Sequence, residues 1–357
     1  MTATLVAPHA ATSLEDLLTR SGPEAVALSG ADQSAWNGQV IESTGEVLGF
    51  AHWDGTLYLG ESILDPLRQM YERSGEKQPV ADLVRYRESL ATILHEQAHF
   101  LGPAGATQEA ARGAFTRPGG RQLEEGVAEA WAQDHLNDFV SRVGVDKVAP
   151  GINDVKNGGY YPAYVPAVRI LTTELENRAG LDRGEVLEAL NRQTAEGQLP
   201  LVVGLLYNTT RLPEFETAAE GAEVRGRLEA VLREGLPQLD GFEGLPPGYA
   251  AARSRSTTGA LLDRLDTELK AAEAQHFPHP TACALPAPTA SALPAPPAPA
   301  LADPAGSAPT ATARLIPSAQ HVALSGLAPP TPLPGSSTSS GARAADRRAS
   351  LPKALGR

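Results

Sequence analysis

Hydrophobic positions near the N-terminus change from a helix-like to a strand-like spacing. Ser13, a residue type that caps helices, precedes a short predicted helix over 13–20. From about residue 24 the pattern favours strands at 24–29, 37–43 and 46–53. The segment 49–60 predicts a β-hairpin, because Asp54-Gly55 supplies turn chemistry between two runs of β-forming residues.

Helix-like periodicity dominates the chain after residue 60. The strongest pattern covers 80–102 and ends at Gly102-Pro103, a combination typical of a helix C-terminus. A loop rich in small residues then runs to about Gly120. Further helices are predicted over 62–75, 121–143, 164–180, 183–197, 222–236 and 259–275. Together with the strands, these helices indicate the α+β class.

The composition changes abruptly beyond His276. Of the 30 prolines, 16 lie in residues 278–357, among Ala, Ser and Thr. Such a segment buries too little apolar area to offset its chain entropy. We therefore predict a flexible leader over 1–12, one folded domain over 13–275 and a disordered tail over 276–357, which is a candidate arm for a protein partner.

The charge and cysteine content of the chain bear on which ligands it can bind and on where in the cell it is expected. The chain has a net charge of −12, but residues 278–357 hold six Lys/Arg and two Asp/Glu, which leaves a strongly acidic body. This balance argues against nucleic-acid binding and against docking on anionic lipid. Cys283 is the one cysteine, and neither a signal-peptide pattern nor an apolar stretch of 18 residues occurs. We expect a cytoplasmic protein with no membrane span, although leaderless export stays open.

The sequence His95-Glu96-Gln97-Ala98-His99 lies inside the strongest predicted helix. Residues four apart share one helical face, so His95 and His99 can bind the same zinc ion. Glu96 follows the first ligand and can take a proton from a metal-bound water. A chain of this composition is expected to contain roughly 0.01 such motifs by chance.

A catalytic zinc site needs a third protein ligand. Gly105 occupies the position at which one family of such sites has a third histidine, so that pattern fails. The next predicted helix supplies carboxylates instead. Glu125 is the predicted ligand and Glu124 its competitor, while Glu129, one turn after Glu125, is expected to hydrogen-bond to a ligand imidazole.

These residues resemble the HExxH zinc metallopeptidases, specifically the glutamate-liganded branch that includes thermolysin and the aminopeptidase-N-like enzymes. Glu125-Gly126-x-Ala128 is similar to the family's N-E-G-x-A string, with Glu124 in place of Asn. The specific match covers about residues 90–130. The resemblance implies a zincin-like, two-lobed domain, with a small twisted sheet and helices in the N-terminal lobe and a mainly helical C-terminal lobe. It also implies one Zn²⁺ per chain.

The reaction expected from this resemblance is hydrolysis of a peptide bond in a peptide or protein substrate, with Glu96 as general base. Such enzymes need a donor for the oxyanion of the tetrahedral intermediate. Tyr161 and Tyr164 are the preferred candidates, and Tyr160 and His135 the others. Two alternatives remain: a non-catalytic binding or structural protein on the same scaffold, and an exported peptidase effector or toxin. Replacing Glu96 separates the hydrolase from the non-catalytic protein.

Overall fold

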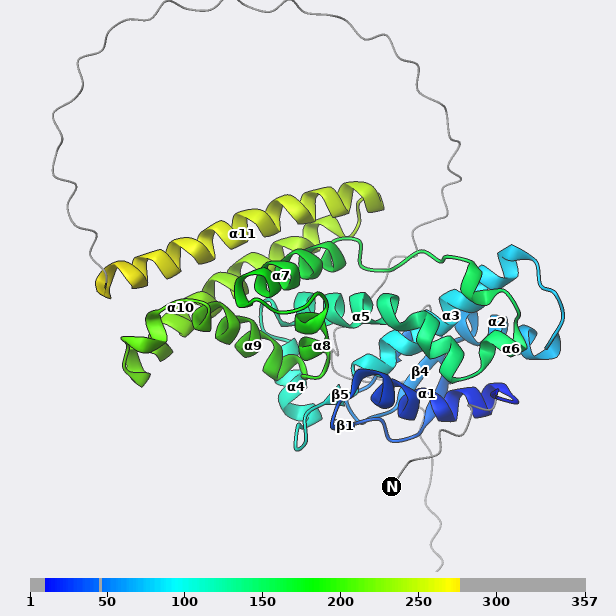
Figure 1. Cartoon of the computed structure of the whole chain (residues 1–357). Helices are drawn as coiled ribbons and strands as arrows, with labels where there is room; N and C mark the ends of the chain where they lie inside the picture. Colours follow the sequence, from blue (N-terminus) through cyan, green and yellow to red (C-terminus); the bar gives the residue numbers. More distant parts are fainter. Residues whose placement is uncertain (1–9, 45–46, 277–357) are drawn as a thin grey trace, which may run out of the picture. The chain divides into compact units, whose positions relative to one another are not determined.

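The computed structural model describes residues 10–44 and 47–276, and these form an α+β fold that is mostly helical (Figure 1). The elements are α1 (Leu14–Ser29), β1 (Gln33–Ser34), β2 (Val40–Ser43), β3 (Gly49–Ala51), β4 (Leu57–Gly60), α2 (Glu61–Glu72), α3 (Val80–Ala98), β5 (Leu101–Gly102), α4 (Gln108–Phe115), α5 (Gly120–Arg142), α6 (Val145–Val148), η1 (Ile152–Asp154), α7 (Tyr164–Ala179), α8 (Glu185–Asn191), α9 (Ala195–Asn208), η2 (Leu212–Glu214), α10 (Ala218–Gly235), η3 (Leu236–Phe242) and α11 (Pro247–His276).

A three-stranded sheet in the order β2-β4-β3 is formed by residues that precede α3 in the sequence. β2 is parallel to β4, and β3 is antiparallel to it with Gly49 opposite Leu59, which confirms the predicted hairpin. Gly55 in the turn has a φ of +88°, and a Cβ there would lie 2.4 Å from the Ala35 carbonyl oxygen. Glycine is therefore required in this turn. In the strand order β2-β4-β3, β3 is an edge strand of the sheet.

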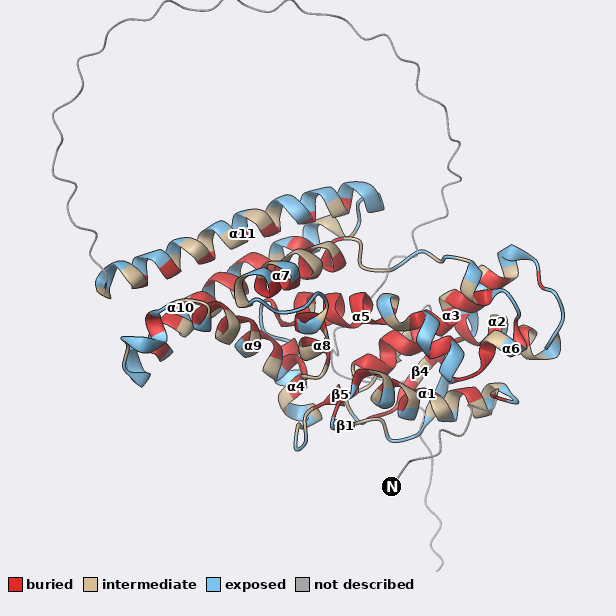
Figure 2. Cartoon of the chain, in the orientation of Figure 1, coloured by how far each residue is buried: buried red, intermediate tan, exposed pale blue. Residues whose placement is uncertain are grey.

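α3 and α5 form the centre of the described fold. α5 packs against α1, α3, α4 and α6 and also against α7, α8 and α9. Figure 2 shows buried residues along most of both helices. Consequently polar side chains on α3 and α5 that face each other are buried together, among them His95, Glu124, Glu125 and Glu129.

A glycine permits close approach between α5 and α7. A Cβ at Gly126 would lie 2.6 Å from Val168 Cγ2 and 3.1 Å from the Tyr164 carbonyl oxygen. Any larger residue at position 126 would push the start of α7 away from α5. Gly126 thus sets the distance between the helix that carries Glu125 and the tyrosine-rich segment that precedes α7.

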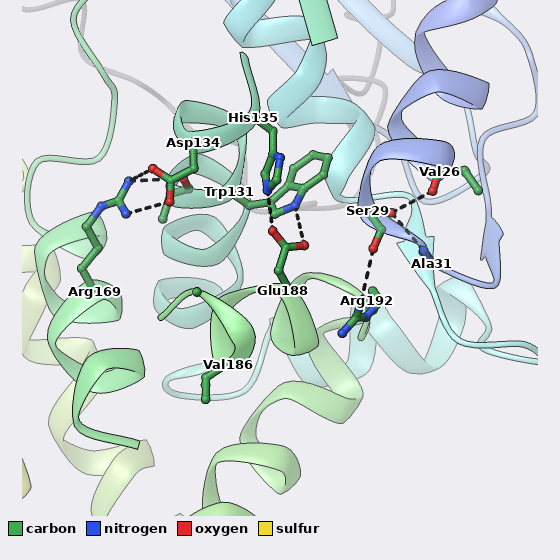
Figure 3. A network of polar contacts seen from close by, with 12 residues as sticks. Val26, Ser29, Ala31, Trp131, Asp134, His135, Arg169, Val186, Glu188 and Arg192 are labelled. Carbon is green, nitrogen blue, oxygen red and sulfur yellow. Dashed lines mark hydrogen bonds and ion pairs between the residues drawn. The ribbon is translucent and has the colours of Figure 1, made fainter. Parts of the chain in front are cut away.

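A polar network ties α5 to α7 and α8 (Figure 3). Trp131 Nε1 donates to Glu188 Oε2 at 3.1 Å, and His135 contacts the other oxygen of the same carboxylate. Arg169 of α7 binds Asp134 of α5 through two hydrogen bonds of 2.8 and 2.9 Å. These contacts hold the orientation of α5 about its own axis.

Four sequence predictions about secondary structure were wrong. The helix predicted over 80–102 ends at Ala98, and Leu101–Gly102 form β5, which pairs with β1. Residues 24–29 belong to α1, not to a strand, because the helix continues through Pro23 to a left-handed cap at Gly30 and buries Leu17 and Ala25 on one face. The predicted loop before Gly120 contains α4, which begins at the side-chain cap of Thr107. The helix predicted over 183–197 ends at Asn191, and a separate helix, α9, follows it.

Some predictions concern residues outside the described ranges. The predicted leader and tail, apart from residues 10–12 and His276, lie there, as does Cys283. Within 10–44 and 47–276, no helix combines the length and apolar character needed to cross a lipid bilayer.

Candidate metal centre

Three donor atoms from two helices converge in the described fold. His95 lies in the last turn of α3, His99 directly follows that helix, and Glu125 lies in the second turn of α5. The two Nε2 atoms of the histidines are 3.1 Å apart. Glu125 Oε2 lies 3.3 Å from His95 Nε2 and 3.4 Å from His99 Nε2. The three atoms therefore form a nearly equilateral triangle.

The other ring nitrogen of each histidine faces a further carboxylate. His95 Nδ1 lies 3.0 Å from Glu129 Oε2, and His99 Nδ1 lies 3.0 Å from Glu124 Oε1. A carboxylate at Nδ1 favours the tautomer with its proton on Nδ1 and a lone pair on Nε2. Glu124, the competing ligand in the sequence analysis, thus contacts the far side of His99, whereas Glu125 meets both Nε2 atoms.

This arrangement can hold a metal ion. When both imidazoles are neutral with the proton on Nδ1, the two Nε2 atoms are acceptors 3.1 Å apart, and they face an acceptor oxygen at 3.3 and 3.4 Å. Glu125 Oε2 is buried and accepts no hydrogen bond from the described residues. A buried acceptor without a partner is costly, and a cation among the three atoms would satisfy all of them. His95, His99 and Glu125 accordingly form a group that could hold a metal ion.

Glu129 is itself held in place by α5 and by the loop before α7. Its Oε1 atom accepts hydrogen bonds from Gln133 Nε2 at 2.8 Å and from the Tyr160 amide at 2.9 Å. Sequence reasoning missed Gln133, although its position one helical turn after Glu129 was a usable signal. Gln133 and Tyr160 therefore orient the carboxylate that orients His95.

Buried charges of opposite sign shift the pKa values of these groups. Burial lowers the pKa of His95, but its contacts with Glu125 and Glu129 outweigh this and raise it to about 9. Burial likewise opposes protonation of His99, yet the carboxylates of Glu125 and Glu124 raise its pKa. Burial would raise the pKa of Glu125, and the neighbouring imidazoles instead lower it. The site is therefore built to stabilise positive charge among its donor atoms.

Glu96 lies on the wall of the cavity that contains His99 and Glu125. Its Oε2 atom accepts a hydrogen bond of 2.8 Å from the amide of Ala51 on β3. A Cβ at Gly49 would lie 2.7 Å from both Cγ and Oε1 of Glu96, so the edge strand approaches this carboxylate because it has no side chain there. Burial raises the pKa of the Glu96 carboxyl.

The structure separates the two preferred tyrosine candidates. The ring of Tyr161 stacks on His95, with ring centroids 5.6 Å apart, and Tyr161 lines the cavity. It has a φ of +54°, the one positive φ of a non-glycine residue in the described ranges. Such backbone strain is typical of functional sites.

Tyr164 is directed elsewhere. Its hydroxyl donates a hydrogen bond of 2.7 Å to Asp240 Oδ1, and its ring stacks on that of Tyr161. The cavity is lined by neither Tyr164 nor the two weaker candidates, Tyr160 and His135. Tyr164 therefore packs against the ring of Tyr161 but does not reach the cavity. His135 contacts Glu188 instead.

The chain was compared with known protein families, curated proteins and solved structures. No family model, no curated protein and no solved structure matches the chain.

Proposed function

We propose that this chain is a zinc-dependent peptidase, in which His95, His99 and Glu125 bind the metal and Glu96 is the general base. The observation that carries the proposal is the triangle of donor atoms, with sides of 3.1, 3.3 and 3.4 Å. Tetrahedral ligands at 2.0–2.1 Å from zinc lie roughly 3.3–3.4 Å apart. Two imidazoles and one carboxylate also match the ligand set of catalytic zinc sites with an open position.

Zinc bound there would polarise the scissile carbonyl and activate the attacking water. Glu96 would take the proton of that water and return it to the leaving amine. The hydrogen bond from the Ala51 amide holds one of its oxygens, so the carboxylate keeps a fixed orientation for the transfer. The raised pKa of this buried carboxyl makes it a better base than an exposed one would be.

β3 would bind the substrate backbone. Gly49, Phe50 and Ala51 line the cavity on a strand that has β4 as its one neighbouring strand in the order β2-β4-β3, and the amide of Ala51 on this strand donates to Glu96. An extended peptide can add to such an edge by backbone hydrogen bonds, which require no particular side chain. This geometry would align a peptide bond along the cavity beside Glu96.

Tyr161 would support the oxyanion. Its ring is fixed between His95 on one side and Tyr164 on the other, with stacked centroids at 5.6 and 5.4 Å. Burial, and the nearby charge of Glu125, raise its pKa, so the phenol keeps its proton and can donate it in a hydrogen bond. A preoriented donor stabilises developing negative charge without reorganisation.

The zincin-like, two-lobed domain is part of this proposal. The sheet and α1–α3 would form one lobe, and α7–α11 the other, with α5 packed against helices of both groups. Under this reading the ligands from α3 and α5 lie where the lobes meet, and the cavity between them is the substrate cleft.

The test uses the full chain loaded with one equivalent of zinc and a mixture of unfolded proteins as substrate. New N-termini counted by mass spectrometry report cleavage. Glu96→Gln should lower the cleavage rate by about 10²–10⁴-fold while zinc content stays unchanged. Glu88→Gln, a half-buried glutamate of the same helix outside the cavity, is the matched control. Equal cleavage by wild type and Glu96→Gln would contradict the proposal and favour a non-catalytic role.

A further inference from the structure

The segment that links η1 to α7, residues 155–163, brings two of its residues to the candidate metal centre, and we call it the connecting segment. The Tyr160 amide donates to Glu129 Oε1 at 2.9 Å, and Glu129 Oε2 in turn faces His95 Nδ1. The ring of Tyr161 stacks on the His95 imidazole. The position of the connecting segment therefore affects both the carboxylate and the aromatic ring that orient His95.

The connecting segment approaches α5 closely and is strained beside it. A Cβ at Gly159 would lie 2.0 Å from Gln133 Nε2 and 3.2 Å from Glu129 Oε1, so only glycine lets the backbone come this near. Two residues later, Tyr161 has its φ of +54°. A backbone in this region persists only where surrounding contacts hold it. The segment therefore needs an anchor on a rigid neighbouring element.

Arg87 of α3 provides such an anchor. Its Nε atom donates to Asn157 Oδ1 of the connecting segment at 2.9 Å. Its Nη1 atom donates to Asn153 Oδ1 at 3.4 Å and to the Ile152 carbonyl at 3.5 Å, both in η1. The rigid fork of a guanidinium can hold several oxygens in one fixed geometry. One side chain thus joins α3 to η1 and to the connecting segment.

Arg87 is buried without a carboxylate beside it. It is 8% exposed, and among the described residues its hydrogen bonds go to three oxygens that carry no formal charge. Burial lowers its pKa, and no acidic neighbour opposes the shift. Arg85, two residues earlier on the same helix, is instead exposed and pairs with Asp82. A buried cation without a counter-ion destabilises a fold, so global stability does not explain this arginine.

We propose that Arg87 is a positioning residue of the metal centre, which acts through Asn157 and the connecting segment on Tyr161. It does not line the cavity and therefore reaches the site only through that segment. Without Arg87 the segment is free to relax the strained φ of Tyr161, and the ring then leaves its place on His95. The positioning itself requires no enzymatic activity, whereas its effect on the reaction rests on the proposed peptidase function.

The first experiment needs neither metal nor turnover. Hydrogen exchange followed by mass spectrometry on the full chain compares peptides that cover the connecting segment with peptides from α10. Arg87→Gln should speed exchange in the segment about tenfold and leave α10 unchanged. Arg85→Gln is the matched control and should change neither. Equal acceleration in both regions, or no acceleration in the segment, would overturn the proposal, because the arginine would then serve only global stability or nothing.

Variants of Asn157 test the same contact from the other side, and they leave the buried arginine in place. Asn157→Ala should speed exchange in the segment as Arg87→Gln does, and the double variant should exceed neither single one, because both remove one contact. Asn157→Asp places a carboxylate opposite the guanidinium and should keep exchange at the wild-type rate or slow it. Faster exchange in Asn157→Asp would contradict the anchoring role.

The last experiment measures the effect on the reaction with the zinc-loaded chain and one peptide substrate. Arg87→Gln should lower kcat about tenfold with KM and zinc content unchanged, and Asn157→Asp should keep the wild-type kcat. Wild-type kcat in Arg87→Gln would overturn the effect on the reaction. If the wild type cleaves no peptide, the peptidase proposal fails, and the exchange rates alone still decide whether Arg87 positions the segment.

Discussion

The Nε2 atoms of His95 and His99 face each other at 3.1 Å, while the opposite nitrogen of each ring faces a glutamate at 3.0 Å. Two imidazoles hold this geometry at low cost only when a proton or a metal ion lies between the facing lone pairs. Since Glu125 Oε2 completes the triangle and has no hydrogen-bond donor of its own, a metal ion satisfies all three atoms at once.

Metal analysis should therefore find about one zinc per chain, and His99→Ala should lose it. Zinc at 1,000 times its dissociation constant should stabilise the wild type by about 4 kcal/mol, because only the folded state assembles the three ligands. Mass-spectrometric metal content and thermal unfolding with and without zinc give the two readouts. His135→Ala, whose imidazole contacts Glu188 instead, should retain the metal; if it loses zinc as His99→Ala does, the assignment is wrong.

The two adjacent glutamates should differ in their effect on zinc affinity. Glu125→Gln removes a charged ligand and should abolish tight binding, because its oxygen lies within 3.4 Å of both Nε2 atoms. Glu124→Gln removes only the partner of His99 Nδ1 and should weaken binding about 10- to 100-fold. Competition with a chromophoric chelator measures both. The reverse order of effects would make Glu124 the ligand.

Gly126→Ala should lower the free energy of unfolding by about 1–3 kcal/mol, because the added methyl group would overlap Val168 and the backbone of Tyr164. Urea unfolding followed by circular dichroism measures the change. Gly226→Ala in α10, where an added Cβ meets nothing within 4 Å, should instead stabilise the chain by about 0.5–1 kcal/mol. Equal effects of the two substitutions would show that α5 and α7 do not approach so closely.

The contact between His135 and Glu188 should make stability depend on pH. This contact is the largest cause of the raised pKa of His135. A raised pKa in the folded state means that the contribution is complete below the unfolded-state pKa of about 6.5 and is lost as pH rises through the folded-state value. The stability difference between wild type and His135→Gln, below about 1 kcal/mol for a pair that is partly open to solvent, should shrink as pH rises above about 6.5. A difference that grows over this range would contradict the assignment.

Local patterns in the sequence were sufficient for the elements that carry the chemistry. The apolar repeat over 80–102 and the Asp54-Gly55 turn predicted α3 and the hairpin, because helix periodicity and turn chemistry act between near neighbours. The same patterns failed at 24–29, where apolar residues suited either a strand or a helix, and burial of α1 against α3 and α5 decided the outcome. α4 was missed because it is only eight residues long and lies in a stretch rich in Gly, Ala and Thr, where a loop was the simpler interpretation.

The sequence by itself determined that His95, Glu96 and His99 share the end of one helix and that several carboxylates follow on the next, since spacing along a helix sets which residues share a face. Only the tertiary structure decided which carboxylate meets the histidines. The rotation of α5 about its axis sends Glu125 between the imidazoles and Glu124 and Glu129 behind them. That rotation depends on packing against α3, α7 and α8. Such contacts join residues far apart in the chain, and no local pattern records them.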